Sequence, residues 1–215
     1  MNYLNEVEQK VAESLLQIKA IKLQPKNPFT WASGWKSPIY CDNRVALSHP
    51  AIRTYIRQKL SQLIQEEFGS VDMISGVATA GIPQGVLVAQ DLGLPFSYVR
   101  SSAKDHGRQN LIEGEVISGQ RVVVIEDLVS TGKSSLQAVK ALREAGCNVV
   151  GLVSIFTYGL EVARKNFEEA KCTFHSLCNY DALIHVAASN SYILESDIEL
   201  LEKWKIDPAN WNPES

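Results

Sequence analysis

The sequence has little of the features that mark membrane, secreted and nucleic-acid-binding proteins. No apolar run approaches the roughly 20 residues that a membrane-spanning helix needs. The 21 Lys and Arg residues are outnumbered by 24 Asp and Glu residues, so the basic surface typical of nucleic-acid binders is not expected. Acidic residues occur throughout the N-terminal 21 residues, which argues against a secretory signal.

Cysteine is also scarce. The four cysteines, Cys41, Cys147, Cys172 and Cys178, form no CxxC pair. Buried, reduced thiols are therefore favoured over disulfides or a zinc site, and this is consistent with a cytoplasmic protein.

What the sequence does contain is a regular alternation of apolar patterns. Helical periodicity is followed by short, wholly apolar runs, each leading into another helical segment. We expect helices over 4–18, 52–68, 82–93, 132–146 and 160–167, strands over 71–77, 95–100, 121–127, 148–156 and 172–177, and a helical tail from 181. Strands that are hydrophobic throughout and alternate with helices predict an α/β fold, with a central parallel sheet flanked by helices.

In such sheets, ligands bind outside the carboxyl ends of the strands. Three segments should therefore converge there: the turn after Val77, the loop after Arg100 and the turn after Asp127. The chemistry of the protein is expected in these three segments.

The stretch VVVIEDLVSTGKSS, residues 122–135, ends a buried strand with two acids and then opens a helix. Amide groups at a helix start, with nearby hydroxyls, suit a phosphate, while Glu126 and Asp127 could accept hydrogen bonds from vicinal sugar hydroxyls. This combination indicates a site for ribose 5-phosphate. The alternative is a helix cap with two surface acids. A triphosphate-binding P-loop is disfavoured because Asp127 replaces its first glycine.

The same stretch resembles the 5-phosphoribosyl 1-diphosphate (PRPP) binding motif of type I phosphoribosyltransferases. The resemblance implies PRPP contacts along the whole motif, from the two acids to the start of the helix. Beyond those acids the implied residues are Leu128, Val129, Ser130, Thr131, Gly132, Lys133 and Ser134.

A long polar stretch, 101–119, separates two of the predicted strands and carries clustered cations. Such a loop is usually functional or disordered, and its cations suit a diphosphate leaving group; a solvated charged hairpin is the alternative. VRSSAKDHG resembles the catalytic loop of orotate phosphoribosyltransferases. The match covers Arg100, Lys104, Asp105 and His106, and it implies PRPP contacts by Arg100, Lys104 and His106. The resemblance implies that Lys104 and His106, together with Asp127 of the PRPP motif, are catalytic. Ser101 departs from the pattern, which usually has lysine there.

The segment FTWASGWKSPIYCDNR, residues 29–44, resembles the hood that covers the base in that family. The resemblance implies orotate contacts by Ser130 and by Tyr40, whose ring would stack on the pyrimidine. Arg44 could pair with the orotate carboxylate, or it could form a surface or interface salt bridge. Ala32 occupies a position that is often lysine.

The turn SGVATAGIPQG, residues 75–85, has small residues that let backbone amides approach a diphosphate. The resemblance implies PRPP contacts at Ala78 and Thr79, and a strained or cis peptide between them. The alternative is a turn of small residues that serves helix–sheet packing. Ala80 and Tyr158 replace a lysine and an arginine of the family, so Tyr158 cannot hold a carboxylate by charge.

Taken together, the resemblance covers roughly 28–156 and implies transfer of the phosphoribosyl group from PRPP to orotate. It implies Mg²⁺ bound through PRPP with Asp127 nearby, and a homodimer with shared active sites. It also implies one domain over 1–215, in which 1–45 supply an N-terminal helix and the hood.

Two rival functions on the same fold stay open. A purine phosphoribosyltransferase should lack both the hood pattern and the KDHG loop. A regulator that senses PRPP without catalysis should add a DNA-binding segment or lose the catalytic loop.

Overall fold

The computed structural model describes residues 5–31, 34–102 and 111–212. In chain order its elements are α1 (Glu6–Gln17), β1 (Ile21–Leu23), β2 (Phe29–Thr30), β3 (Lys36–Ser37), β4 (Ile39–Cys41), the 3₁₀ helix η1 (Asn43–Ser48), α2 (Pro50–Phe68), β5 (Met73–Val77), α3 (Gly81–Leu92), β6 (Phe96–Val99), β7 (Ile112–Glu113), β8 (Arg121–Val129), α4 (Lys133–Glu144), β9 (Asn148–Thr157), α5 (Glu161–Glu169), β10 (Phe174–Asn179), α6 (Tyr180–Ser189), η2 (Glu195–Asp197) and α7 (Ile198–Ile206). Every helix and strand predicted over 4–181 is confirmed to within two residues at its ends.

The central sheet has six strands in the order β10-β9-β8-β5-β6-β7. All neighbours pair in parallel except β7, which pairs antiparallel with β6 through Tyr98–Glu113 and Val99–Ile112. The sheet is therefore mostly parallel, as predicted. The edge strand β7 was missed, because its two residues lie in the stretch interpreted as a polar loop.

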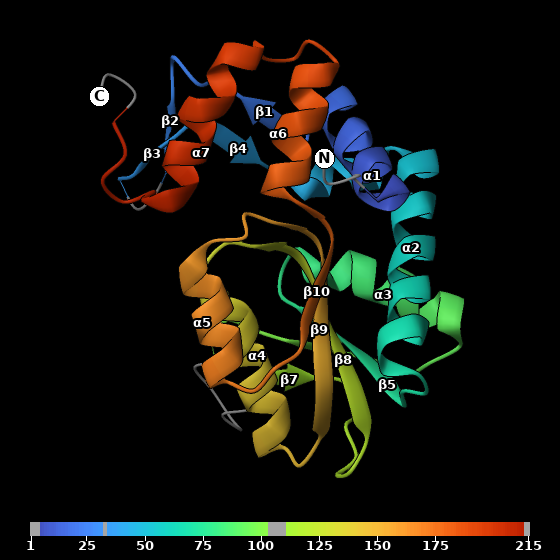
Figure 1. The fold of residues 1–215 in the computed structure, drawn as a ribbon. Helices are drawn as coiled ribbons and strands as arrows, with labels where there is room; N and C mark the ends of the chain where they lie inside the picture. The colour runs from blue at the N-terminus through green and yellow to red at the C-terminus, as the bar shows by residue number, and fades with distance from the viewer. Residues whose placement is uncertain (1–4, 32–33, 103–110, 213–215) are drawn as a thin grey trace.

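Helices cover both faces of the sheet (Figure 1). The helices α2 and α3 contact one face and α4 contacts the other, with α5 packed beside it. Side chains of β8 alternate between two cores: Val123 and Ile125 join the cluster with α2 and α3, while Val122 and Val124 join the cluster with α4 and α5. This period of two is what a strand buried on both faces requires.

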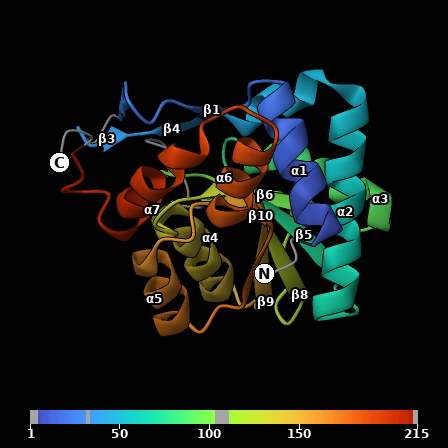
Figure 2. The same ribbon diagram turned by 45° about the horizontal axis from the view of Figure 1, so that its top comes forward.

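The N-terminal segment forms a hood over one end of the sheet, and the C-terminal helices pack against it (Figures 1 and 2). Its small strands pair as β1 with β4 and β2 with β3. Helix α1 begins with a capping box, in which the Asn5 side chain accepts a hydrogen bond from the Val7 amide at 2.7 Å. Helices α1 and α6 contact each other, so segments from both ends of the chain build this part of the molecule.

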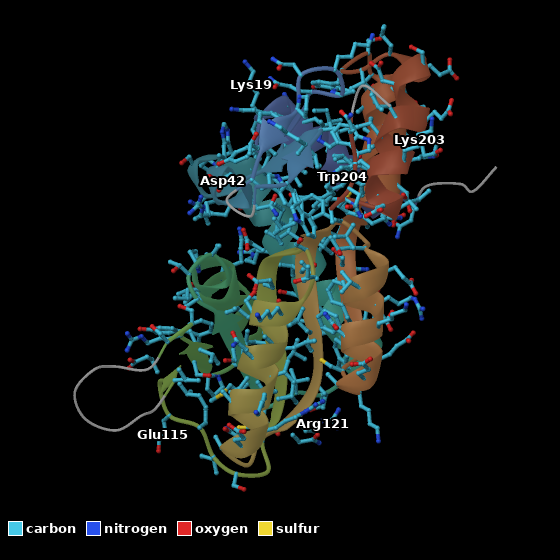
Figure 3. All side chains as sticks on the ribbon, turned by 90° about the vertical axis from the view of Figure 1, so that its left-hand side faces the viewer. Lys19, Asp42, Glu115, Arg121, Lys203 and Trp204 are labelled. Carbon is cyan, nitrogen blue, oxygen red and sulfur yellow. The ribbon has the colours of Figure 1, made fainter. Side chains whose placement is uncertain are left out.

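A cluster of aromatic rings joins the hood to helix α7. The Trp204 ring lies 5.7 Å from Trp31, 5.6 Å from Tyr158 and 5.1 Å from Tyr180, measured between ring centroids. Its indole Nε1 donates a hydrogen bond to the Lys36 carbonyl at 3.3 Å. Trp204 is fully buried and lies in the upper half of the molecule in Figure 3. The sequence pattern did not indicate that α7 would fix the hood.

Within the described ranges, no helix combines the length and the apolar character needed to cross a membrane. All four cysteines are free; Cys147, Cys172 and Cys178 are buried as predicted, whereas Cys41 is half-buried.

Candidate active site

The acid pair predicted at the end of a strand lies near the carboxyl end of β8. This strand continues two residues beyond Asp127, because Leu128 and Val129 still pair with Phe156 and Thr157 of β9. The prediction that the strand ends at 127 was therefore short by two residues. The extension holds the acids on regular, hydrogen-bonded backbone instead of a loose turn.

Glu126 is 5% exposed and Asp127 is half-buried. The Glu126 carboxylate accepts a hydrogen bond from the Asp127 amide at 3.0 Å and one from the Ser135 hydroxyl at 3.3 Å. Burial, with the negative charge of Asp127 as second cause, raises the pKa of Glu126 to about 9. Burial also raises the pKa of Asp127. At neutral pH Glu126 is the protonated member of the pair, since two adjacent buried carboxylates resist carrying two charges.

This pair makes the stability of the protein depend on pH. The folded-state pKa of Glu126 exceeds its ordinary value of 4.5, so the stabilising proton is fully present below pH 4.5 and is lost as the pH rises through about 9. We expect the free energy of unfolding of Glu126→Gln, measured by urea titration, to rise relative to the native protein between pH 6 and pH 9. The exposed Glu169→Gln should show no such trend, and parallel curves for the native protein and Glu126→Gln would contradict the assignment.

The turn after β8 leads directly into helix α4. Gly132 adopts φ +77°, and a Cβ there would lie 2.6 Å from the Phe167 ring, so both the turn and the packing of α5 require glycine. Asn166 of α5 donates a hydrogen bond from Nδ2 to the Thr131 carbonyl at 2.9 Å. The turn that precedes the helix start is thereby held in place, with the α4 amides directed along the helix axis towards an incoming anion.

Helix α3 comes very close to the acid pair. A Cβ on Gly81 would lie 2.5 Å from the Ile125 carbonyl oxygen, and a Cβ on Gly76 would lie 2.9 Å from the Gly81 oxygen. The peptide bond between Ala78 and Thr79 is cis, as the resemblance implied. Small residues in this turn therefore do serve helix–sheet packing, and they also bring the turn beside β8.

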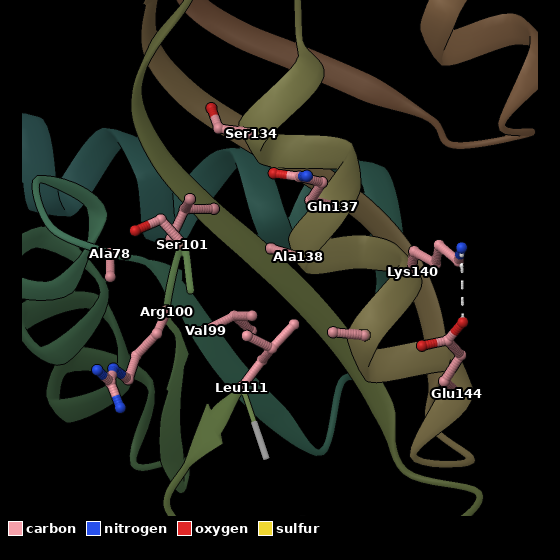
Figure 4. A pocket seen from close by; sticks show the side chains of 12 residues that line it. Ala78, Val99, Arg100, Ser101, Leu111, Ser134, Gln137, Ala138, Lys140 and Glu144 are labelled. Atoms are coloured by element: carbon pink, nitrogen blue, oxygen red, sulfur yellow. Dashed lines mark ion pairs between the residues drawn. The ribbon is translucent and has the colours of Figure 1, made fainter. Parts of the chain in front are cut away.

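The three predicted segments do converge. Ala78, Arg100 and Ser134 line one cavity of about 230 Å³ beside α4 (Figure 4). Arg100 forms an ion pair with Glu113 of β7, at 3.6 Å between Nη1 and Oε1. Ser101, which replaces a lysine of the family, lines the same cavity.

The polar side chains among the predicted contacts on the turn are at least partly accessible. Ser130 and Thr131 are half-buried, and Lys133 and Ser134 are exposed at the start of α4. The Val129 carbonyl accepts hydrogen bonds from the Tyr158 amide and the Thr157 hydroxyl, both at 3.1 Å. Lys104, Asp105 and His106 of the predicted catalytic loop, and Ala32 of the hood, lie outside the described residues.

The hood segment carries two of the predicted orotate-binding residues, Tyr40 at β4 and Arg44 in η1. Tyr40 is 42% exposed, with its ring 5.7 Å from that of Phe29. Arg44 forms a two-point ion pair with Asp42, at 2.6 Å from Nε to Oδ1 and 2.9 Å from Nη2 to Oδ2. The structure therefore shows the salt-bridge alternative for Arg44, formed with a neighbour on the same segment. This pairing lowers the pKa of Asp42.

Tyr158, which stands where the family often has arginine, is 3% exposed within the aromatic cluster. Burial raises the pKa of its hydroxyl well above the ordinary value. Its ring packs against Trp31 and Phe156, so it supports the hood instead of carrying charge to a ligand.

A family model described as "Phosphoribosyl transferase domain" matches residues 46–184. An orotate phosphoribosyltransferase of Phocaeicola vulgatus is 57% identical over 208 residues, covering 97% of this chain and 98% of its own. The chain belongs to the orotate phosphoribosyltransferase family. It is accordingly an enzyme of the pentosyltransferase class.

Further relatives agree with this family assignment. An orotate phosphoribosyltransferase of Listeria monocytogenes is 54% identical, covering 95% of this chain and 98% of its own. The crystal structure of orotate phosphoribosyltransferase from Aeropyrum pernix matches with a TM-score of 0.74 at 26% identity, covering 85% of this chain and 99% of that one. The fold is thus that of type I phosphoribosyltransferases, as the motifs predicted.

Three residues that support the site were not singled out from the sequence. Ser135 donates a hydrogen bond to the Glu126 carboxylate, and Asn166 donates one to the Thr131 carbonyl. Asn43 of η1 donates one to the Asp127 carbonyl at 2.7 Å. Ser135 follows the motif directly and could have been suspected from that position. Asn43 and Asn166 act on the motif from distant segments, and no local pattern marks them.

Proposed function

We propose that this protein transfers the 5-phosphoribosyl group from PRPP to N1 of orotate, as a step of pyrimidine nucleotide biosynthesis that leads to UMP. The bond from N1 to the ribose C1 forms and N1 gives up its proton to pyrophosphate or solvent, while the C1–oxygen bond to the diphosphate breaks and its electron pair leaves with pyrophosphate. The product is orotidine 5'-monophosphate. The observation that carries the proposal is the acid pair of β8, with Glu126 buried and Asp127 half-buried, beside the start of α4 in a chain of this family.

The acid pair and the start of α4 would bind different parts of the ribose 5-phosphate. Glu126 and Asp127 would accept hydrogen bonds from the two ribose hydroxyls, and a protonated Glu126 can also donate one. The α4 amides, with the hydroxyls of Ser130, Thr131 and Ser134, would bind the 5-phosphate. The amides of 128–134 and of the turn at Ala78 and Thr79 complete the proposed PRPP contacts.

The base would bind between the hood and the turn after β8. Tyr40 offers a ring that is 42% exposed for stacking. Ser130, in the turn after β8, would supply a polar contact. Arg44 is exposed on the hood, and its pair with Asp42 would have to open or be shared for it to bind the orotate carboxylate. Tyr158 does not compete for this role because it is buried among aromatic rings.

Lys104 and His106 would stabilise the charge that develops on the leaving diphosphate, while Arg100 lies at the base of their loop. Because charge develops on the sugar and on the leaving diphosphate in the transition state, positioning and charge stabilisation would supply most of the rate enhancement. A carboxylate oxygen of Asp127 fits Mg²⁺, which prefers hard oxygen ligands and would take its others from PRPP. When bound, the ion would offset the negative charge of the diphosphate.

We also propose that the protein acts in the cytoplasm as a homodimer with shared active sites. The free cysteines support a reducing compartment. The family resemblance of the loop that starts at Arg100 supports the shared sites.

The proposed reaction predicts a specific effect of Lys104→Ala. The native protein should consume orotate, followed by its ultraviolet absorbance, only when PRPP and Mg²⁺ are both present. Because Lys104 would act on the leaving group, Lys104→Ala should lower kcat about 10²–10³-fold. The matched variant Lys10→Ala, at an exposed position on α1, should keep the native rate.

The outcomes of this assay separate the rival functions. Turnover with a purine base in place of orotate would identify a purine enzyme. Binding of PRPP by calorimetry without turnover of any base would identify a regulator, and either result would overturn the proposal.

A further inference from the structure

Asn43 is a buried side chain whose two polar ends reach different parts of the active site. It is 1% exposed and begins η1, two residues after the last residue of the hood strand β4. Its Nδ2 donates a hydrogen bond to the Asp127 carbonyl at 2.7 Å, across 84 positions of sequence. Its Oδ1 accepts one from the Cys41 thiol at 3.3 Å.

The Asp127 carbonyl, which accepts the Asn43 hydrogen bond, lies beyond the part of β8 that is paired with β5. Strand β5 is paired with β8 only as far as Gly76 with Ile125, so β8 extends beyond β5 at Asp127. A buried carbonyl without a donor costs about 1–3 kcal/mol. Asn43 supplies that donor, and the position of η1 thereby becomes tied to the backbone of the acid.

Cys41 connects the side-chain amide of Asn43 to the proposed base site. It follows Tyr40 directly in β4 and is half-buried. Tyr40 is thus connected to Asp127 through Cys41 and Asn43. In this path the Asn43 side chain is the one that joins the hood to β8. In the described part of the chain, the bond from Asn43 is the only side-chain hydrogen bond that joins η1 to β8.

We propose that Asn43 is a positioning residue that couples the base site in the hood to the ribose-binding acid of β8. When ribose hydroxyls fix Asp127, the hydrogen bond from Asn43 fixes the hood in the position that accepts the base. Binding at each site therefore strengthens binding at the other, as linkage requires. The inference rests on the proposed roles of Tyr40 and Asp127.

The test uses two ligands that cannot react with each other, orotate and ribose 5-phosphate. Calorimetry gives the Kd of orotate for the full-length protein with and without saturating ribose 5-phosphate. We expect the native protein to bind orotate about 5-fold or more tightly when ribose 5-phosphate is present. In Asn43→Asp, which keeps the shape and loses the donor, and in Asn43→Ser, the ratio of the two Kd values should fall towards one.

Asn166→Ser is the matched control. It removes the same kind of hydrogen bond, from an asparagine Nδ2 to a backbone carbonyl, but at Thr131 and from α5. It should weaken ribose 5-phosphate binding while the ratio for orotate stays near the native value. If the role of Asn43 were purely structural, its variants would bind both ligands more weakly, and the ratio of the two orotate Kd values would stay unchanged.

If the Asn43 variants fail to fold, Cys41→Ala tests the same path from its other end and should lower the ratio. A native ratio of one, or a native-like ratio in folded variants of both residues, would overturn the inference. Turnover of orotate by the native protein in the same preparation shows separately whether the proposed function holds.

Discussion

Asp127→Asn should lower kcat/KM for PRPP by about 10²–10³-fold, the range seen when one preorganised electrostatic contact is removed from an active site. The side chain keeps its shape, and the Asn43 hydrogen bond to its backbone carbonyl does not depend on the carboxylate. The loss should therefore come from charge and not from unfolding. Initial rates of orotate consumption over a range of PRPP concentrations measure it.

The control is Asp72→Asn at the opposite end of the sheet. Asp72 accepts a hydrogen bond from the Arg121 amide at 2.7 Å, where β8 begins. Its replacement also removes one carboxylate from the same sheet, and kcat/KM should stay within about twofold of native. Equal losses in both variants would mean that the effect of Asp127→Asn is general destabilisation.

Trp204→Ala should reduce the free energy of unfolding by about 3–5 kcal/mol, as expected when a large buried aromatic ring is deleted. Trp204 fills the space between Trp31, Tyr158 and Tyr180, and it is the ring through which α7 supports the hood. Urea denaturation followed by circular dichroism measures the change. The hood would also lose its support, so KM for orotate should rise more than KM for PRPP.

Two further variants separate packing from hydrogen bonding. Trp204→Phe keeps a ring but loses the bond to the Lys36 carbonyl, which should cost about 1 kcal/mol plus a small packing loss. Trp211→Ala makes the same chemical change at a half-buried position near the C-terminus and should cost less than Trp204→Ala. A loss below 1 kcal/mol for Trp204→Ala would show that the hood is held by other contacts.

Local patterns in the sequence were sufficient to predict the fold class and the main motif. The run from Val122 to Ile125 is apolar at every position, which indicates a strand buried on both faces. The glycine at 132 marks the turn into α4, and Gly93 marks the end of α3 with φ +67°. These features act between neighbouring residues, so they can be predicted without knowledge of the tertiary structure.

Features that depend on distant partners were not predicted. Strand β7 is two residues long and exists because it pairs with β6. Helix α7 was expected only as part of a helical tail, and its contact with the hood depends on Trp204 reaching Trp31 across the chain. The raised pKa of Glu126 likewise follows from burial between packed elements, not from its neighbours in sequence alone.

The sequence by itself determined the α/β fold and the order of its strands and helices. It also indicated the acid pair and helix start that suit a ribose 5-phosphate, because periodicity and turn chemistry are local properties. Only the tertiary structure decided that β8 extends beyond Asp127, that Tyr158 is buried and that Arg44 pairs with Asp42. It also placed Asn43 against the Asp127 carbonyl. A contact between residues 84 positions apart is set by how the hood packs on the sheet, and no local pattern specifies that packing.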